Sequence, residues 1–581
     1  MQTIDRVFLL LILCLALSCS GPSVAQSSGP EVKTYITPEE ALPQLQQLFR
    51  REAHYQRLSG TVLIRHRESI IYQAAFGKTS RGIVAGQHTR FDIGSISKSF
   101  TAAAILHLAK EGQLNLQDPI NDHLGQHRSD QWKKVTIHQL LTHTSGIPSI
   151  YQTEQGLPLF YPQETPILLD SLISRFQAGK LLFKPGSSFS YSNSGYVLLA
   201  VIVSQVSGLS FDAYLERHIF RPYGLEHTSF QTGPQAAQPY YGYRETLSRP
   251  APRHHWSWAI GAGGIYTNAA DLSQWLDLIQ SDHFLSAEWR ASYLQSHTSA
   301  GYGYGWQFTR EGKIQHDGGA AGFVSFASFD PYSGHQIVLL TNRSFEDTRQ
   351  FSFSSQYVRS LADKAWDILA GKETEILPAP GHMPALEGNY QFDQGIELSF
   401  TPESNASAWV HTTGVMASRI MADTPLASAT KKERMMNDLA DLLHRKKHWG
   451  VAKYCNGEMK FVSYTGLLSI GMKMIRKKTG QVQSAVAYYV NADYGLIRLK
   501  GDQQSVDIQV YFDSTGKIQG LADRRYFSPK GEIPLLAHAT ADGRFFLDGF
   551  DLGEPDAFLE LTGNSLRLTQ SGRTIEAKRI E

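Results

Sequence analysis

The sequence predicts a mixed α/β (α+β) domain that is followed by a mainly β C-terminal region. Three observations support this prediction. The chain has 581 residues, and because hydrophobic cores stop growing at roughly 250–300 residues, more than one domain is expected. The part before residue 372 shows the order helix, hairpin, helical middle, three strands and helix. Beyond a proline-rich break, β-type runs dominate.

The first elements follow from hydrophobic periodicity and helix-capping signals. Residues 39–54 carry apolar side chains at helical spacing, with Thr37 as the N-cap and Pro38 at the first helical position. Residues 60–66 and 69–76 are β-rich runs separated by a short polar turn. This pattern predicts an antiparallel hairpin after the first helix.

The rest of the first domain is predicted in the same way. Residues 97–111 are apolar on most sides and stop at Gly112, which predicts a buried helix with Ser95 at or just before its N-terminus. The remaining elements are helical patterns at 135–141 and 195–206, strands at 313–316, 323–330 and 336–341, and a helix at 351–369.

A loss of periodicity marks the boundary between the two parts of the chain. Residues 378–384 are rich in proline, which is typical of a linker. The predicted organisation is a signal peptide at 1–25, a first folded domain at 33–372, a linker at 373–385 and a strand-rich C-terminal domain at 386–581 with a helix-plus-sheet insertion at 430–528.

The N-terminus predicts export. Arg6 precedes an apolar run at 7–17 and a small-residue ending at 23–25, which is typical of a cleaved signal peptide. This run is too short to span a membrane, and no later segment is apolar enough to cross one. An alternative interpretation takes 16–19 as an imperfect lipoprotein box in which Cys19 carries a lipid anchor. The expected location is periplasmic or extracellular, as a soluble protein or a lipoprotein.

The composition excludes one class of partner and one source of stability. With 55 basic and 54 acidic residues, the net charge of +1 gives no long-range field that would gather nucleic acid or an anionic membrane. Cys455 is the only thiol away from the N-terminal leader, so no intrachain disulfide framework can form. The expected partner is a small-molecule or peptide substrate, and the oligomeric state stays open.

Ser95 and Lys98 form the first candidate for chemistry. A serine hydroxyl is a poor nucleophile at neutral pH and needs a base within hydrogen-bond reach. Side chains at i and i+3 share a helix face, so the Lys98 amine can reach Ser95, and burial would lower its pKa. A lone Ser-x-x-Lys pattern also arises by chance. Two further motifs follow in matching order, Tyr191-Ser192-Asn193 and His316-Asp317-Gly318.

Four longer segments carry a family resemblance. They are 91–101 (FDIGSISKSFT), 136–148 (TIHQLLTHTSGIP), 185–196 (PGSSFSYSNSGY) and 261–266 (GAGGIY). Together with the His316 motif they span most of residues 33–372. This part of the chain resembles the serine β-lactamase and DD-peptidase superfamily, specifically its class C-like branch of penicillin-binding proteins, D-aminopeptidases and related esterases. The resemblance implies a catalytic domain in which helices flank an antiparallel sheet.

The resemblance also implies residue roles. Ser95 would form the acyl-enzyme, and Lys98 and Tyr191 would share proton transfer. No cofactor or metal is implied. The implied substrate-binding residues are Asn193, which would bind the amide of the acyl side chain, and the third motif, His316, Asp317 and Gly318. The oxyanion hole would use the backbone N–H groups of Ser95 and Gly319.

The third motif departs from the β-lactamase pattern. Drug-hydrolysing members of the family place a lysine followed by a hydroxyl residue there to hold a carboxylate, whereas this chain has His316 and Asp317. A mostly neutral histidine is a weaker carboxylate anchor, and an ionised Asp317 facing the pocket would repel a substrate carboxylate unless it is paired. We therefore expect a substrate without a carboxylate there, such as an ester, an amide or a peptide with a free amine.

Other polar residues invite a different interpretation. His138 and His143, and likewise His254 and His255, do not show the spaced ligand cluster that a zinc hydrolase needs. The segment that contains His143 is expected to support the site, not to supply catalytic groups. The glycines of 261–264 are expected to permit close backbone approach beside the pocket.

Two classes of function stay open. One is a serine hydrolase acting on an ester, an amide or a D-peptide, with a true β-lactamase ranked last among the enzymes. The other is a penicillin-binding or cell-wall peptide-binding protein with little turnover. The C-terminal region carries no catalytic motif; its strand openings at 388–390 and 543–546 are similar to lipocalin-like β domains, and 512–518 bears a weaker likeness to small cystatin- or NTF2-like folds.

Overall fold

The computed structural model describes residues 35–376 with short gaps, and strands from the rest of the chain. The gaps are 81–82, 151–163, 243–247, 345–347 and 375, and the later part comprises strands between Gly388 and Ile580 with a short helical stretch within 434–439. The predicted signal peptide at 1–25, the alternative anchor at Cys19, the thiol of Cys455 and most of the predicted linker at 373–385 lie outside the described residues.

A six-stranded antiparallel sheet forms the centre of the first domain, in the order β2-β1-β12-β11-β10-β9. The N-terminal hairpin joins the late strands because β1 pairs with β12 from Gly60↔Thr341 to His66↔His335. Strands β1 and β2 pair with each other, which confirms the predicted hairpin. The strands are β1 (Gly60–His66), β2 (Ser69–Phe76), β9 (Gln307–Phe308), β10 (Ile314–Ala320), β11 (Phe323–Phe329) and β12 (His335–Thr341).

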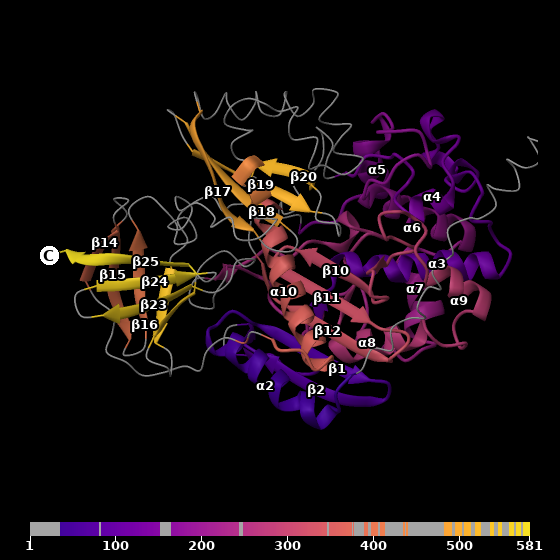
Figure 1. Ribbon diagram of the computed structural model, residues 1–581. Helices are drawn as coiled ribbons and strands as arrows, with labels where there is room; N and C mark the ends of the chain where they lie inside the picture. The colour runs from indigo at the N-terminus through magenta and orange to yellow at the C-terminus, as the bar shows by residue number, and fades with distance from the viewer. Residues whose placement is uncertain are drawn as a thin grey trace, which may run out of the picture.

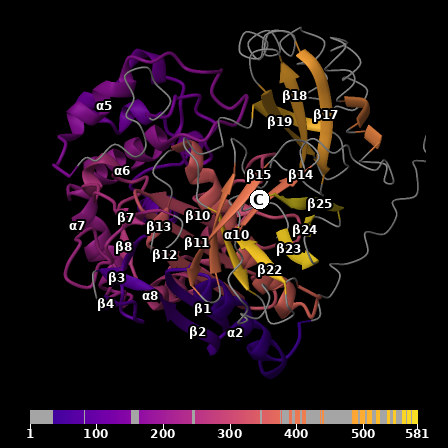
Figure 2. The same cartoon turned by 90° about the vertical axis from the view of Figure 1, so that its left-hand side faces the viewer.

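Helices cover both faces of this sheet (Figures 1 and 2). Alternate residues of β1 point to opposite faces, so Val62 lies in the core beneath α2 and α10, whereas Leu63 lies in the larger core that contains α3 and α6. The predicted class of helices with an antiparallel sheet is thereby confirmed. The helices are α2 (Pro38–His54), α3 (Ser97–Lys110), α4 (Ile137–Leu141), α5 (Leu169–Gln177), α6 (Asn193–Ser207), α7 (Phe211–Leu215), α8 (Ala269–Leu278), α9 (Ala287–Tyr293) and α10 (Thr348–Leu369).

Helix α2 begins where its capping signals predict. The Thr37 side chain accepts a hydrogen bond from the Glu40 N–H, and the Glu40 side chain accepts one from the Thr37 N–H. Helices α5, α7, α8 and α9 were not predicted from the sequence. Short strands complete the domain: β3 (Lys78–Ser80), β4 (Ile83–Val84), β5 (Phe91–Asp92), β6 (Tyr240–Tyr241), β7 (Arg249–Pro250), β8 (Tyr266–Thr267) and β13 (Arg343–Ser344).

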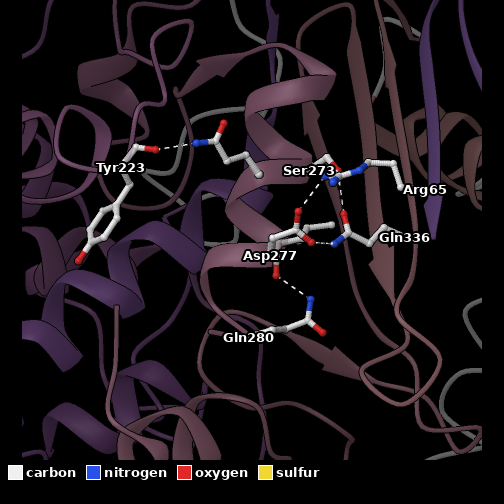
Figure 3. Close-up of polar contacts among 8 residues, drawn as sticks. Arg65, Tyr223, Ser273, Asp277, Gln280 and Gln336 are labelled. Carbon is white, nitrogen blue, oxygen red and sulfur yellow. Dashed lines mark hydrogen bonds and ion pairs between the residues drawn. The ribbon is translucent and has the colours of Figure 1, made fainter. Parts of the chain in front are cut away.

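A polar cluster fixes α8 against the sheet (Figure 3). Arg65 on β1 donates to Asp277 at 2.8 Å and to Ser273 at 3.0 Å, both on α8. Gln336 on β12 accepts a hydrogen bond from Ser273 at 2.7 Å and donates one to Asp277. Because the cluster satisfies the polar groups of two strands and one helix at once, α8 has a defined position beside the sheet.

Strand β10 is longer than the sequence predicted. The predicted strand covers residues 313–316, although Gly319 was expected on the same strand as His316. In the structure residues 317–319 stay in the strand and pair with β11, from Asp317↔Phe326 to Gly319↔Val324. The glycines are needed for close approach, since a Cβ on Gly318 would lie 1.9 Å from the Ile93 carbonyl oxygen.

The C-terminal strands form two further sheets. Eight of them close a barrel in the order β14-β15-β16-β21-β22-β23-β24-β25, the architecture that lipocalins use. In the sequence, a four-stranded sheet, β17-β18-β19-β20, is inserted between the barrel strands β16 and β21 (Figure 1). The strands are β14 (Gly388–Phe392), β15 (Glu397–Ser404), β16 (Ser407–Thr412), β17 (Val482–Val490), β18 (Tyr494–Gly501), β19 (Ser505–Phe512), β20 (Ile518–Asp523), β21 (Leu535–Ala539), β22 (Phe545–Asp548), β23 (Ala557–Thr562), β24 (Ser565–Gln570) and β25 (Arg573–Ile580).

In the described part of the chain, no single helix has both the length and the apolar character needed to cross a membrane. Helix α6 and the helical segment Phe211–Phe220 reach that length only when they are counted together across a 73° bend.

Candidate active site

The turn that carries Ser95 is fixed by backbone contacts on two sides. Strand β5 pairs with β8 and leads into a 3₁₀ turn, Gly94–Ile96, which precedes α3. Gly94 has φ +49°, and a Cβ there would lie 2.3 Å from the Gly319 nitrogen of β10. Only glycine fits this left-handed position. The turn therefore presents Ser95, which is half-buried, directly beside β10.

Lys98 lies fully buried one helical turn after Ser95. Its Nζ donates hydrogen bonds to Asn193 Oδ1 at 2.7 Å and to the Ala262 carbonyl oxygen at 2.7 Å, and it lies 3.0 Å from Ser95 Oγ, within hydrogen-bond distance. Burial lowers the pKa of the Lys98 amine well below its usual range, although the negative charge of Asp317 acts in the opposite direction. The amine is thus held against the serine hydroxyl in surroundings that favour its neutral, proton-accepting form.

Helix α6 and the residues before it bring Tyr191 and Asn193 to the same amine. Ser192 caps α6 by accepting a hydrogen bond from the Gly195 N–H, which places Asn193 in the first turn. The Lys98 Nζ lies 5.0 Å from the centroid of the Tyr191 ring, within cation–π range. Residues that are 93 and 95 positions beyond Lys98 in the sequence therefore surround it in space.

His316 on β10 is buried and neutral. Its Nδ1 lies 2.6 Å from the carbonyl oxygen of Asp317. Because a carbonyl only accepts, Nδ1 carries the proton, and Nε2 accepts a hydrogen bond from the Tyr302 hydroxyl at 3.2 Å. Burial lowers the pKa of His316 to about 4. At neutral pH this residue offers no positive charge to a substrate.

The Asp317 carboxylate is paired on the α10 side of β10. Arg359 donates to one carboxylate oxygen at 2.7 Å and Ser355 donates to the other at 2.7 Å. Burial raises the pKa of Asp317, but the Arg359 charge, the neighbouring His316 and the hydrogen bonds from Ser355 and Arg359 together outweigh this effect and leave that pKa below its usual value. The carboxylate is therefore ionised and compensated, which is the paired case that the sequence analysis left open.

One cavity of about 410 Å³ connects the predicted residues. Those that line it are Ser95, Tyr191, Asn193, His316, Asp317 and Gly319. Lys98 is buried beside Ser95, and Gly318 packs against Ile93, the residue that precedes the turn Gly94–Ile96. The structure thus gathers every residue that the motifs singled out.

The sequence analysis missed Asp92, which also lines this cavity. Its carboxylate accepts hydrogen bonds from the backbone N–H groups of Gly94, at 2.8 Å, and Gly264. Burial nevertheless raises the pKa of Asp92 to about 6. Asp92 is a carboxylate only three residues before Ser95 in the sequence, and this closeness was a signal that could have identified it. Ser149, His254, His255 and Trp256 are further lining residues without an assigned motif role.

The glycine-rich segment 261–264 lies beside the cavity as predicted. A Cβ on Gly261 would lie 2.3 Å from the Tyr196 carbonyl oxygen, so this glycine allows close backbone approach. The Gly261 carbonyl accepts a hydrogen bond from Thr101 at 2.7 Å, and the next carbonyl, of Ala262, accepts from Lys98. Within the described residues, no three His, Cys, Asp or Glu side chains are grouped so that they could hold a metal ion.

Comparisons with known proteins agree with this architecture. Protein flp of Staphylococcus aureus (strain MW2) is 30% identical over 284 residues, 45% of this chain and 55% of that protein. Putative penicillin-binding protein PbpX of Bacillus subtilis (strain 168) is 30% identical over 287 residues, 48% of this chain and 70% of that protein. The chain thus spans about half the length of the staphylococcal relative.

A solved structure extends the likeness in fold to most of the chain. The octameric penicillin-binding protein homologue from Pyrococcus abyssi has a TM-score of 0.51 and 19% sequence identity, and the match covers 92% of this chain and 100% of that one. The family model described as Beta-lactamase matches residues 45–356, which contain the whole cavity. The chain therefore belongs to the beta-lactamase family.

Proposed function

We propose that the protein is an exported serine hydrolase that acts through an acyl-enzyme on an ester, amide or D-peptide substrate. The observation that carries this proposal is the 3.0 Å hydrogen bond between the buried Lys98 amine and the Ser95 hydroxyl. A hydroxyl with a neutral amine within hydrogen-bond reach is an activated nucleophile. The leader described in the sequence supports export to the periplasm or beyond, as a soluble protein or a lipoprotein.

The proposed reaction uses two acyl transfers. Ser95 Oγ attacks the substrate carbonyl carbon while its proton passes to Lys98 Nζ, and the carbonyl oxygen becomes an oxyanion held by the N–H groups of Ser95 and Gly319. As the carbon–leaving group bond breaks, the proton moves to the leaving group with help from Tyr191. Water then attacks the acyl-enzyme by the same route in reverse.

The charges around the cavity favour a substrate without a carboxylate at the third motif. His316 is neutral and Asp317 is already paired with Arg359. Among the described residues that line the cavity, none is a lysine or an arginine. A substrate carboxylate would lose its hydration there without gaining a cationic partner, which is costly. We therefore rank an ester or amide substrate above a penicillin.

Covalent labelling tests the proposed function. We expect intact-mass analysis to show a single adduct at Ser95 with a fluorophosphonate, and turnover of p-nitrophenyl acetate or a D-alanyl amide, both lost in Ser95→Ala. A stable penicillin adduct without turnover would favour the second candidate, a penicillin-binding protein. The name of the Bacillus subtilis relative supports that candidate. If no probe reacts in a Ser95-dependent way, the proposal is wrong.

Replacing Asp317 with threonine should shift substrate preference toward carboxylates. The change removes the negative charge behind His316 on the α10 side of β10 and frees Arg359 from its 2.7 Å ion pair. We expect the ratio of kcat/KM for a carboxylate-bearing ester to that for its methyl ester to rise about tenfold, the equivalent of ~1.4 kcal/mol. Matched pairs of aryl ester substrates would give this ratio.

Ser355→Ala is the matched control for this change. It removes one hydrogen bond to Asp317 but leaves the carboxylate paired with Arg359. The ratio should stay within about twofold of the wild-type value, because serine is uncharged and the Arg359–Asp317 ion pair is kept. An unchanged ratio in Asp317→Thr would show that Asp317 does not discriminate against carboxylates.

A further inference from the structure

His143 has a backbone conformation that a residue with a side chain seldom adopts. Its φ is +59°, in the left-handed region, and its side chain is buried. Non-glycine residues persist there only when their surroundings hold them, and such residues concentrate at functional sites. His143 directly follows Thr142, the C-cap of α4, so the chain reverses direction at this residue.

Two acceptors on His143 bracket Tyr191. The His143 carbonyl oxygen accepts a hydrogen bond from the Ser190 N–H at 2.9 Å. Its Nδ1 accepts a second from the Ser192 N–H at 3.1 Å. The N–H groups of the residues before and after Tyr191 are thus both bound to one residue.

The imidazole ring also packs against the residue that it brackets. Its centroid lies 4.2 Å from that of the Tyr191 ring, with 37° between the planes. Further along, the Asn193 N–H donates to Ser149 at 3.3 Å. The segment 143–149 therefore holds three backbone N–H groups around Tyr191, those of Ser190, Ser192 and Asn193.

The contact with Ser192 fixes the protonation state of His143. Since a backbone N–H only donates, Nδ1 must be bare, and the neutral ring carries its proton on Nε2. Burial lowers the pKa of His143 well below its usual value, and the charges of Lys98 and His316 act in the same direction. The aromatic neighbours of the ring are Phe189, Tyr191, Tyr196 and Tyr302. His143 therefore remains an acceptor throughout the neutral pH range.

We propose that His143 is a positioning residue, which fixes Tyr191 over Lys98 and Ser95 by accepting the N–H groups of Ser190 and Ser192. This inference rests on the proposed function. His143 touches neither the substrate nor the reacting atoms in this scheme; its effect passes through Tyr191. A displacement of about 1 Å in a proton-transfer group can lower a rate by about 10²-fold, so the loss of this hold should reduce kcat more than it raises KM.

Two substitutions separate the hydrogen bond from the ring packing. In His143→Asn, the ring is lost but an acceptor is kept, because Oδ1 of asparagine is bonded to Cγ just as Nδ1 of histidine is. Asparagine also tolerates the left-handed backbone region. In His143→Phe, the ring is kept and the acceptor is lost. We expect His143→Asn to lower kcat about threefold and His143→Phe about 30-fold or more, with KM changed less than about threefold in both.

The measurements are steady-state hydrolysis of p-nitrophenyl acetate, the rate of fluorophosphonate labelling at Ser95, and thermal unfolding of each variant. In a Tyr191→Phe background, His143→Phe should add little further loss, because the hydroxyl that it positions is already gone. The reverse order, with His143→Phe active and His143→Asn impaired, would overturn the inference and assign a packing role. Wild-type protein that is not labelled at Ser95 would overturn the proposed function and the inference with it.

Discussion

Replacement of Lys98 with methionine is expected to lower kcat/KM about 10²- to 10⁴-fold, the range that general base catalysis contributes. Methionine fills a similar volume but cannot accept the Ser95 proton. The variant also removes the donor to Asn193 Oδ1 and to the Ala262 carbonyl. Steady-state kinetics with the ester or amide that labels Ser95 would measure the loss.

The pH dependence separates loss of the base from loss of structure. The reactive form of Lys98 is neutral, so kcat/KM of the wild-type protein should fall as pH drops through the lowered pKa of this amine. The pH profile of Lys98→Met should lack this fall in kcat/KM at low pH. A fall near pH 6 that persists in the variant would belong to Asp92, whose pKa burial raises to about 6.

Lys110→Met is the matched control for Lys98→Met. Lys110 lies in the last turn of the same helix, is exposed, and donates to the Phe284 carbonyl far from the cavity. We expect its kcat/KM to stay within about twofold of wild type. Equal losses in the two variants, or full activity in Lys98→Met with an unchanged pH profile, would remove Lys98 from the proposed reaction.

The parts of the site that the sequence predicted depend on local geometry. Ser95 and Lys98 are three residues apart on a helix, so their proximity follows from helical periodicity alone. The start of α2 also follows from local signals, with Thr37 as the N-cap and Pro38 at the first helical position. Tyr191 and His316 came from the order of the motifs and the family resemblance, since no local rule brings residues that far apart together.

The parts that the sequence did not predict depend on long-range contacts. The sequence left open whether Asp317 is paired, whereas in the structure it continues β10, and alternation along the strand turns its carboxylate to α10, away from His316. Its partners Ser355 and Arg359 lie 38 and 42 residues later. One backbone donor to Asp92 is Gly94, two residues later, but the other is Gly264, and periodicity carries no signal for that distant contact.

The C-terminal region shows the same division. Its strands were predicted from β-type runs, but closure of the barrel requires β14 to pair with β25, as in Asn389↔Ile580. That register joins residues at opposite ends of the region, and one extra sheet, β17 to β20, interrupts the barrel strands in the sequence. Strand propensity specifies neither feature, because pairing depends on which faces and edges meet in space.

Gly318→Ala is the second substitution for which we expect a large effect, a loss of about 10²- to 10³-fold in kcat/KM. The new Cβ would lie 1.9 Å from the Ile93 carbonyl oxygen and 3.2 Å from the Ser95 nitrogen, so backbone must move. Movement of β10 away from the nucleophile turn would separate the N–H of Gly319 from that of Ser95, and loss of one oxyanion donor costs about this factor. Kinetics and thermal unfolding would be measured together.

Gly86→Ala provides the control for Gly318→Ala, because a Cβ on Gly86 would meet nothing within 4 Å and its backbone is not left-handed. It should leave activity and stability close to wild type. In Gly318→Ala we expect the free energy of unfolding to fall by about 1–3 kcal/mol, the usual cost of overpacking. If Gly318→Ala is still folded but has lost most of its activity, the loss of activity can be assigned to the larger distance between the N–H groups of Ser95 and Gly319. Full activity in Gly318→Ala would mean that β10 does not supply the oxyanion hole.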